Sequence, residues 1–311
     1  MQVLSYIKLA RPDHWFKNIF MLPGILLAFW FTPELWNVGL FMRLPVGFIA
    51  ACLVASSNYV LNEILDAPSD RHHPVKCARP LASGAASIKV AYVLWLCLAA
   101  AGVATGFVLG AAFGAMVLLL WIMGIVYNVR PIRSKDLPYV DVMSEAVNNP
   151  IRLALGWYAV GAVAMPPLSV IMAYWMFGSF LMAVKRFAEF RRIDHPERAA
   201  QYRKSFAYYN GERLLESIMF YAAFFAMMSG VFVTRYQIEL ILVTPLVSVC
   251  MAYYLHLGFK PDSPVQYPES LWRQKKLAVL VTVTFVACAV LLFIDLPAFA
   301  GLFDPWIMPP R

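Results

Sequence analysis

The chain has 311 residues, of which 61% are hydrophobic and only 14% are charged. Soluble domains typically carry about 25% charged residues, so this composition excludes an ordinary soluble protein and indicates an integral membrane protein. The formal net charge of +8 favours anionic partners, either lipid headgroups or phosphorylated substrates. Nucleic acid is not an expected partner, because the sequence shows no soluble basic domain.

Apolar runs of about 20 residues recur along the chain, as is typical of membrane-spanning helices and not of β-barrels. We predict an all-α membrane protein in which residues 1–311 form one polytopic domain with nine transmembrane helices. The predicted spans are 18–36, 44–65, 88–108, 110–129, 141–160, 167–186, 214–234, 238–258 and 277–297. Gly110 and Gly114 bracket a turn between two spans, and Pro166-Pro167 provides another.

Lys and Arg are concentrated in alternate loops, while the opposite loops carry very few of them. By the positive-inside rule, we predict a cytoplasmic N-terminus and a C-terminus outside. The protein is then integral to the cytoplasmic (inner) membrane, with its polar clusters facing the cytoplasm. Within the basic segment of about 187–213, Asp194-His195-Pro196-Glu197 is typical of a helix start. We expect a short amphipathic helix there, either a lipid-surface anchor or a lid.

The first cluster of charged residues follows the second predicted span. Asn62, Asp66 and Asp70 are spaced by four residues, which places their side chains on one face of a helix. Glu63 lies about 100° away, and Pro68 is expected to end the regular helix just before Asp70. Converging carboxylate and amide oxygens are the ligands that Mg²⁺ prefers. The bases that follow, and that can offset repulsion between the acids, are Arg71, Lys76 and Arg79.

The second cluster opens the predicted span 141–160. Asp141, Glu145 and Asn148 (or Asn149) recur at helical spacing, so their polar face should point at a cavity and not at lipid. The phenolic and basic residues that precede them are Tyr127, Arg130, Arg133 and Lys135. Each cluster alone could be a solvated helix end. Two such clusters on one side of the membrane favour a shared site for metal ions and a diphosphate.

These residues carry a resemblance to a known family. Asn62-Glu63-x-x-Asp66-x-x-x-Asp70, ending in Arg79-Pro80-Leu81-Ala82-Ser83-Gly84, resembles the first aspartate-rich motif of the UbiA superfamily of intramembrane prenyltransferases. Tyr127-x-x-x-Pro131-x-Arg133-x-Lys135, followed by Asp141-x-x-x-Glu145, is similar to its second motif. The sequence departs from the family pattern at Glu63, where Asp is usual, and at Glu145, which closes the second motif.

Two shorter segments resemble one branch of this superfamily, which makes decaprenylphosphoryl-5-phosphoribose. They are Arg11-Pro12-Asp13-His14-Trp15-Phe16-Lys17-Asn18 and Lys185-Arg186-Phe187-Ala188-Glu189. The resemblance implies transfer of phosphoribose from phosphoribosyl pyrophosphate to a polyprenyl phosphate, with Mg²⁺ as cofactor. Two phosphorylated substrates would need more cations than a single diphosphate. Lys185-Arg186 could equally be a positive-inside anchor, and Lys17 could simply extend toward the headgroups.

The motifs and this resemblance imply three groups of site residues. The expected catalytic residues are Asn62, Asp66, Asp70, Tyr127, Lys135 and Asp141. The expected metal ligands are Asn62, Glu63, Asp66, Asp70, Asp141 and Glu145. The expected substrate-binding and diphosphate-binding residues are Lys17, Arg71, Lys76, Arg79, Arg130, Arg133, Asn148, Lys185 and Arg186.

Two other functions remain open at this stage. One keeps the fold and the metal site but has a different donor: a prenyl group is transferred from a polyprenyl diphosphate to an aromatic or other lipid-precursor acceptor. The other is a cation-coupled transporter, which the sequence favours less because transporters place ionisable sites near the membrane midplane. Membrane lipids and a polyprenyl lipid substrate are expected partners in either enzymatic case.

Overall fold

The computed structural model describes residues 2–37, 39–71, 76–193, 202–301 and 303, and every regular element in these ranges is a helix. The α-helices are α1 (Gln2–Ala10), α2 (Leu22–Phe31), α3 (Leu40–Asp70), α4 (Ile88–Leu109), α5 (Ala111–Asn128), α6 (Val140–Ala146), α7 (Asn148–Ala159), α8 (Leu168–Arg192), α10 (Gly211–Tyr236), α11 (Thr244–Gly258), α12 (Lys275–Leu292) and α13 (Pro297–Ala300). The 3-10 helices are η1 (Pro12–Met21), η2 (Pro33–Leu35), η3 (Lys76–Ala78), η4 (Ser134–Asp136), η5 (Lys204–Ala207), η6 (Ile238–Val243), η7 (Pro264–Gln266) and η8 (Pro268–Arg273).

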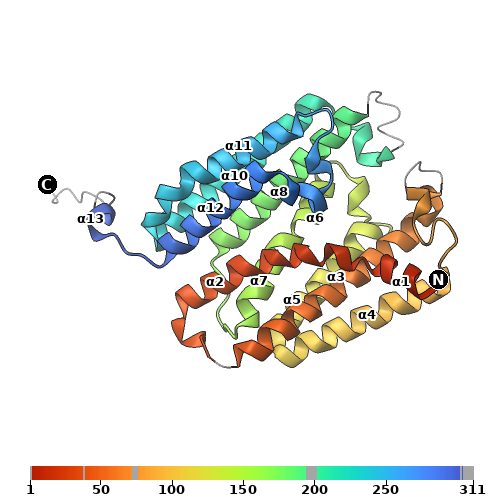
Figure 1. Cartoon of the computed structure of the whole chain (residues 1–311), viewed down its shortest axis with the longest axis horizontal. Helices are drawn as coiled ribbons and strands as arrows, with labels where there is room; N and C mark the ends of the chain where they lie inside the picture. The colour runs from red at the N-terminus through yellow and green to blue at the C-terminus, as the bar shows by residue number, and fades with distance from the viewer. Residues whose placement is uncertain (1, 38, 72–75, 194–201, 302, 304–311) are drawn as a thin grey trace.

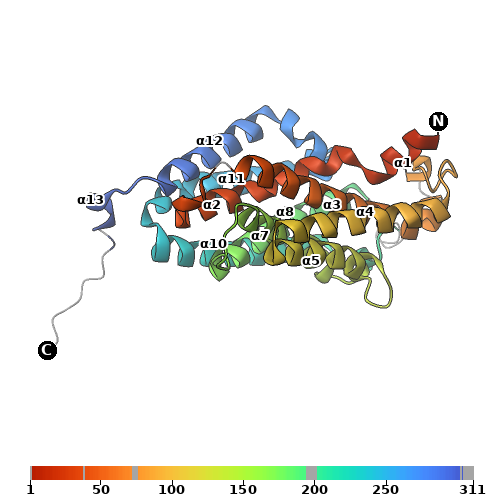
Figure 2. The same ribbon diagram turned by 90° about the horizontal axis from the view of Figure 1, so that it is seen from below.

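The helices form two groups that lie side by side along the bundle (Figure 1). One group contains α2, α3, α4, α5 and α7, and the other contains α8, α10, α11 and α12. Helices α6 and α7 both pack on α8 and so join the two groups. Figure 2 shows α12 and α5 on opposite faces of the molecule. The α1 end of the bundle is opposite the α13 end, and the connections after α3, α5 and α8 lie at the α1 end (Figure 1).

Within the described residues, seven helical segments are long and apolar enough to cross a membrane. They are α3, α4, α5, α8, α10, η6 together with α11, and α12. These segments correspond to seven of the nine predicted spans, and the prediction of an all-helical fold is confirmed. The turn expected between α4 and α5 is present at Gly110, whose φ of 142° is a conformation that a residue with a Cβ rarely adopts.

The other two predicted spans are not single helices but are each divided, so the predicted number of nine spans stays a prediction. Residues 18–36 divide into the end of η1, then α2 and η2, because Pro23 and Pro33 each occupy a position where a helix begins. Residues 141–160 divide into α6 and α7 at Val147. Pro150 lacks the N–H that would bond to the carbonyl group four residues earlier, so the helix is interrupted there.

Two further expectations concern where helices end and begin. Helix α3 continues through Pro68 and ends at Asp70, not just before it. The start of the predicted amphipathic helix, at 194–197, lies outside the described residues. Of the rest of the segment 187–213, residues up to Arg192 continue α8, and Phe206 in η5 is buried in the core between α8 and α10. The described part of this segment therefore packs on the protein through Phe206, and the choice between a surface anchor and a lid stays a prediction.

Helices α2 and α7 are in direct backbone contact through two glycines. A Cβ on Gly24 would lie 1.9 Å from the carbonyl oxygen of Leu153, and a Cβ on Gly156 would lie 2.0 Å from that of Met21. Small residues allow such close packing of membrane helices. This contact fixes α7, and with it the second polar cluster, against the start of the chain.

We predict that Gly156→Ala destabilises the protein, by about 1–3 kcal/mol, because the added methyl group collides with backbone that cannot move independently. Gly230→Ala is the matched control, since nothing lies within 4 Å of the position of its Cβ in α10. The control should be neutral or slightly stabilising. Thermal unfolding in detergent would test both variants, and equal midpoints would contradict the proposed contact.

Candidate active site

Three oxygen atoms from two helices converge on one cation at the end of α3. The Nζ of Lys135 donates hydrogen bonds to Asp66 Oδ1 at 2.7 Å, Asn128 Oδ1 at 2.9 Å and Asn62 Oδ1 at 3.2 Å. Asn62 and Asp66 are one turn apart on α3, and Asn128 ends α5. The predicted pairing of Asn62 with Asp66 on one helical face is therefore present, with a lysine from η4 at its focus.

Arg133 adds a second base to this group. Its Nη2 lies 3.1 Å from Asp66 Oδ1, and its Nε lies 3.2 Å from Asp136 Oδ2. Lys204 is 3.7 Å from the same Asp136 oxygen, which brings η5 against η4. Arg133 has a φ of 32°, a strained value for a residue with a side chain, and so turns the connection after α5 back toward α3.

Asp70 and Glu63 have partners of their own at the end of α3. Asp70 Oδ2 pairs with Arg79 Nη1 at 2.6 Å. Glu63 is only 2% exposed, and its Oε1 accepts a hydrogen bond from the backbone N–H of Leu81 at 3.1 Å. Both contacts hold the connection between α3 and α4 against the helix end. The carboxylate of Glu63 is engaged by the backbone, so its predicted role as a metal ligand has no support in this geometry and stays a prediction.

The second cluster is organised by the guanidinium of Arg186, which is 2% exposed. Its three nitrogens contact Asp141 at 3.2 Å, Glu145 at 2.8 Å and Glu189 at 3.0 Å. The acids Asp141 and Glu145 come from α6, whereas Arg186 and Glu189 belong to α8. Lys185 lies 4.0 Å from Glu189 on the same helix. Arg186 therefore joins α6 to α8 through three charged contacts.

Asp141 is completely buried, and both of its oxygens are in use. Oδ1 accepts from the hydroxyl group of Tyr209 at 2.7 Å, and Oδ2 accepts from Ser205 at 3.3 Å and lies 3.3 Å from Arg203 Nε. Together with Arg186, these groups leave no free face on the carboxylate. We predicted Asp141 as a metal ligand, and that stays a prediction, but its contacts are those of an anchor for the segment after α8.

Tyr127 connects the second cluster to the first. Its hydroxyl group donates to Glu145 Oε2 at 2.9 Å and accepts from Arg203 Nη2 at 2.7 Å. The neighbouring residue in α5, Asn128, bonds Lys135 at the focus of the first cluster. Adjacent residues of one helix thus contact both groups, so the two clusters predicted from sequence form one continuous polar site.

Lys76 lies close to acids of both clusters. Its ammonium group is 5.2 Å from the centre of the Tyr202 ring, which brings the connections after α3 and α8 together. Burial and the nearby Arg79 lower the pKa of Lys76 below the ordinary value of 10.5, while Asp70, Asp66 and Glu189 raise it. The acids that act on Lys76 come from α3 and α8, in agreement with a shared site.

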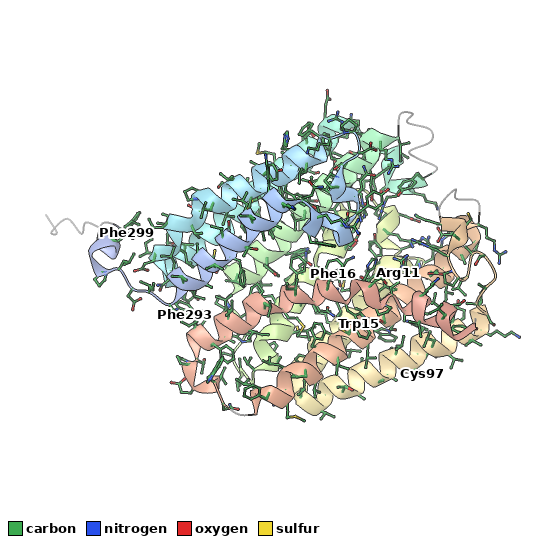
Figure 3. All side chains as sticks on the ribbon, in the orientation of Figure 1. Arg11, Trp15, Phe16, Cys97, Phe293 and Phe299 are labelled. Carbon is green, nitrogen blue, oxygen red and sulfur yellow. The ribbon has the colours of Figure 1, made fainter. Side chains whose placement is uncertain are left out.

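A third set of cations lies deeper, around η1. Lys17 and Arg11 both approach the face of the Tyr59 ring, with their charged groups 5.7 and 5.8 Å from its centre. Figure 3 shows Arg11, Trp15 and Phe16 between the two helix groups, with Cys97 away from them on α4. Lys17 has no ion pair among the described residues.

Arg152 continues this set into the bundle from α7. It is buried, and its Nε donates to Asn18 Oδ1 at 3.0 Å, while Nη1 reaches the carbonyl group of Asn148 at 3.4 Å. Asn148 donates in turn to the carbonyl oxygen of Glu145 at 3.0 Å. No carboxylate pairs with Arg152 in the part of the chain that the structure describes.

The remaining predicted site residues lie apart from these contacts. Arg71 and Arg130 are exposed at the same end of the bundle, and neither makes an ion pair or a side-chain hydrogen bond with another described residue. The residues that the sequence did not indicate as site residues are Asn128, Glu189, Arg203, Ser205 and Tyr209. Asn128 stood inside the quoted motif. Arg203, Ser205 and Tyr209 gave no local signal, because they reach the site from a distant segment.

The first cluster fits a divalent cation better than the second. Its carboxylate and amide oxygens already surround one positive charge, and Asp66 retains some exposure to solvent. In contrast, the second cluster is neutralised by Arg186 and Arg203. Within the described ranges, no group of three or more His, Cys, Asp or Glu side chains is arranged to hold a metal ion by itself. A metal ion here would need Asn62 and oxygens of a substrate as additional ligands.

Comparison with known proteins agrees with this geometry. A model of the UbiA prenyltransferase family matches residues 18–271, most of the chain and both polar clusters. The chain belongs to the UbiA family. It is therefore a transferase of an integral membrane family, as the motifs and helices had indicated.

Two relatives are named decaprenyl-phosphate phosphoribosyltransferase. The one from Mycolicibacterium smegmatis is 31% identical over 217 residues, covering 68% of this chain and 64% of the relative. The one from Corynebacterium glutamicum is 28% identical over 206 residues, covering 65% of this chain and 59% of the relative. This chain thus spans about three fifths of the length of these relatives.

A solved structure shows the same fold. The UbiA homolog from Archaeoglobus fulgidus bound to GPP and Mg²⁺ aligns with a TM-score of 0.68, over 93% of this chain and all of that one. The sequence identity is 20%, so the likeness concerns the arrangement of the helices. It supports the UbiA-like architecture predicted from the motifs.

We predict that Asp141→Ala lowers the free energy of unfolding by about 3–5 kcal/mol, because it leaves the buried Arg186 short of a partner. Asp136→Ala is the control, since Asp136 also pairs with an arginine but its side chain is 24% exposed. That variant should lose no more than about 1 kcal/mol. Chemical unfolding in detergent micelles would compare them. A larger loss in the control would contradict the anchoring role of Asp141.

Proposed function

We propose that this UbiA-family transferase moves 5-phosphoribose from phosphoribosyl pyrophosphate to a polyprenyl phosphate and releases pyrophosphate. The convergence of three oxygens on Lys135 is the observation that carries the proposal, because it supplies both acceptors for a metal ion and a base for a diphosphate. The names of the curated relatives support the choice of substrates. The number of cations supports it as well, since this reaction brings more than one phosphorylated molecule into the site.

Magnesium is the proposed cofactor. Asn62 and Asp66 are the residues that would hold it, with Asp70 nearby if Arg79 moves to the substrate. When bound, Mg²⁺ would neutralise charge on the pyrophosphate leaving group. Its oxygen ligands would be completed by the donor itself, as is usual for Mg²⁺ in phosphate-transferring sites.

The protein's own basic residues would stabilise the leaving group. Lys135, Arg133 and Arg79 surround the place where the pyrophosphate would lie, and they stabilise the negative charge that grows as its bond to ribose C1 breaks. C1 gains oxocarbenium character, and a phosphate oxygen of the lipid forms the new C1–O bond. That oxygen is already ionised at neutral pH, so no general base is required.

The deeper cations provide a place for a second phosphate. Lys17, Lys185 and Arg152 lie near Glu145 and Asn148. We place the acceptor phosphate there, with its isoprenoid tail among the apolar residues of η1 and α2. In this arrangement the two substrates approach the site from different sides, and C1 lies between their phosphates.

A second function keeps the same site but uses a prenyl diphosphate as donor. The structural neighbour bound to GPP and Mg²⁺ is the observation that favours it. An assay with labelled phosphoribosyl pyrophosphate and polyprenyl phosphate decides between the two. Label recovered in the lipid fraction supports phosphoribosyl transfer. No labelled lipid, alongside turnover of a prenyl diphosphate with an aromatic acceptor, would refute it.

We also propose that the site faces the cytoplasm from the inner membrane. The concentration of Lys and Arg at the α1 end of the bundle supports this orientation. A reporter fused after residue 311 should then be found outside the cytoplasm. A cytoplasmic reporter signal would reverse the assignment.

We predict that Asp66→Asn lowers the transfer rate by at least about a hundredfold, because it removes the carboxylate that bonds Lys135 at the focus of the first cluster. Asp262→Asn changes an exposed acid at the same end of the bundle and serves as the control. The control should retain nearly full activity. Thermal unfolding of both variants shows whether a loss of rate reflects chemistry or folding. Full activity in the Asp66 variant would remove the site assignment.

We predict a pH dependence set by Lys76. Its lowered pKa means that its positive charge is lost at a lower pH than for an exposed lysine, so donor affinity should fall as pH rises through that value. Lys76→Arg keeps its charge to higher pH and should move the fall in donor affinity upward. KM for the donor, measured from neutral to alkaline pH in both proteins, tests this. Identical alkaline profiles would exclude Lys76 as the titrating group.

A further inference from the structure

An apolar groove lies between α11 and α12, outside the candidate active site. Its volume is about 560 Å³, and it is lined by Val249, Tyr253, Lys275, Lys276, Val279, Leu280 and Val283. None of these residues contacts the polar clusters of the active site. Val249, Val279 and Val283 are each about half exposed, so the groove opens away from the bundle, toward the surrounding membrane.

The groove is long enough to cover most of one leaflet of a bilayer. Its α12 wall runs from Lys276 to Val283, a helical rise of about 10 Å. One leaflet contributes about half of the ~30 Å hydrocarbon core, so this groove extends from the headgroup level through most of a leaflet. Its wall of valine and leucine side chains offers only apolar surface along that depth.

The charge lies at one end only. Lys275 and Lys276 are the first residues of α12 and are both exposed, and neither has an ion pair among the described residues. Arg273 lies beside them, stacked on the exposed ring of Trp272. A tryptophan with neighbouring cations is typical of the membrane–water interface. The stems of the two lysines line the groove, so their ammonium groups extend from its polar end.

We propose that this groove binds an anionic diacyl phospholipid of the bilayer. One acyl chain lies between α11 and α12, and the phosphate group is held by Lys275 and Lys276. An apolar channel that ends in two exposed lysines complements such a lipid in both shape and charge. This site is independent of the proposed transfer reaction, since no lining residue belongs to the active site.

The test compares phosphatidylglycerol with phosphatidylcholine carrying the same acyl chains. Each is titrated into delipidated full-length protein in detergent, with bound lipid counted by native mass spectrometry. The wild-type protein should bind phosphatidylglycerol at least tenfold more tightly. The double variant Lys275→Gln/Lys276→Gln should weaken that binding about twenty-five-fold, because each cation near an anionic headgroup contributes about fivefold.

Two further variants separate the groove from general surface charge. Lys89→Gln is the matched control, because Lys89 is also an exposed lysine in the first turn of a long apolar helix, α4. It should leave binding unchanged. Val279→Trp fills the groove from an exposed position without altering charge or core, and it should abolish tight binding of phosphatidylglycerol. This variant also tests the proposal if the double variant fails to fold.

Three results would overturn the proposal. The first is equal affinity of the wild-type protein for the two phospholipids. The second is a Lys89→Gln variant that loses as much affinity as the double variant, or a Val279→Trp variant that loses none. The third is displacement of phosphatidylglycerol from the groove by a polyprenyl phosphate, which would show that the groove binds the acceptor substrate. Loss of transferase activity with intact lipid binding would concern the proposed function alone.

Discussion

The guanidinium of Arg186 is the contact on which the polar site depends. One buried cation holds three carboxylates, two from α6 and one from its own helix α8. Burying these charges is unfavourable unless each has partners, so the arrangement is stable only as a complete set. Through Glu145 the set reaches Tyr127 and α5, and through Asp141 it holds the segment that follows α8. Three separate parts of the chain are thereby fixed around one polar site.

This arrangement gives the two acid clusters different characters. At the second cluster, Asp141, Glu145 and Glu189 are matched by Arg186, Arg203 and Lys185, so that its charges balance internally. At the first, the oxygens of Asn62, Asp66 and Asn128 surround a single ammonium group, which a metal ion or a substrate could replace. The first cluster is accordingly suited to binding and the second to holding the site together, although both looked alike as sequence patterns.

The sequence predicts those features that depend on neighbours along the chain. Long apolar runs predicted seven helices, because a helix that crosses a membrane needs about 20 apolar residues whatever surrounds it. Spacing by four correctly placed Asn62 and Asp66 together on α3. The family resemblance placed both motifs in one site, and that site is present as a continuous set of contacts.

Other features depend on partners that helical spacing cannot reveal. Glu63 lies close to Asp66 in sequence, but its carboxylate accepts a hydrogen bond from the backbone N–H of Leu81, in the connection after α3. Arg203 and Tyr209 reach Asp141 from another segment. The sequence around Asp141 therefore does not indicate that its carboxylate oxygens are occupied. The sequence contained the signal for the break between α6 and α7, because Pro150 alone accounts for it. We did not predict the break, because the apolar run continues on both sides of this proline.

The long separation between Asp141 and its bases has a consequence for biosynthesis. Arg186 follows Asp141 by 45 residues, and Arg203 comes later still. During synthesis, α6 and its acids leave the ribosome before either of these bases is available. The buried contacts of Asp141 can therefore form only after α8 and the segment that follows it have been synthesised. The second cluster is thus completed by the later half of the chain, although its acids belong to the earlier half.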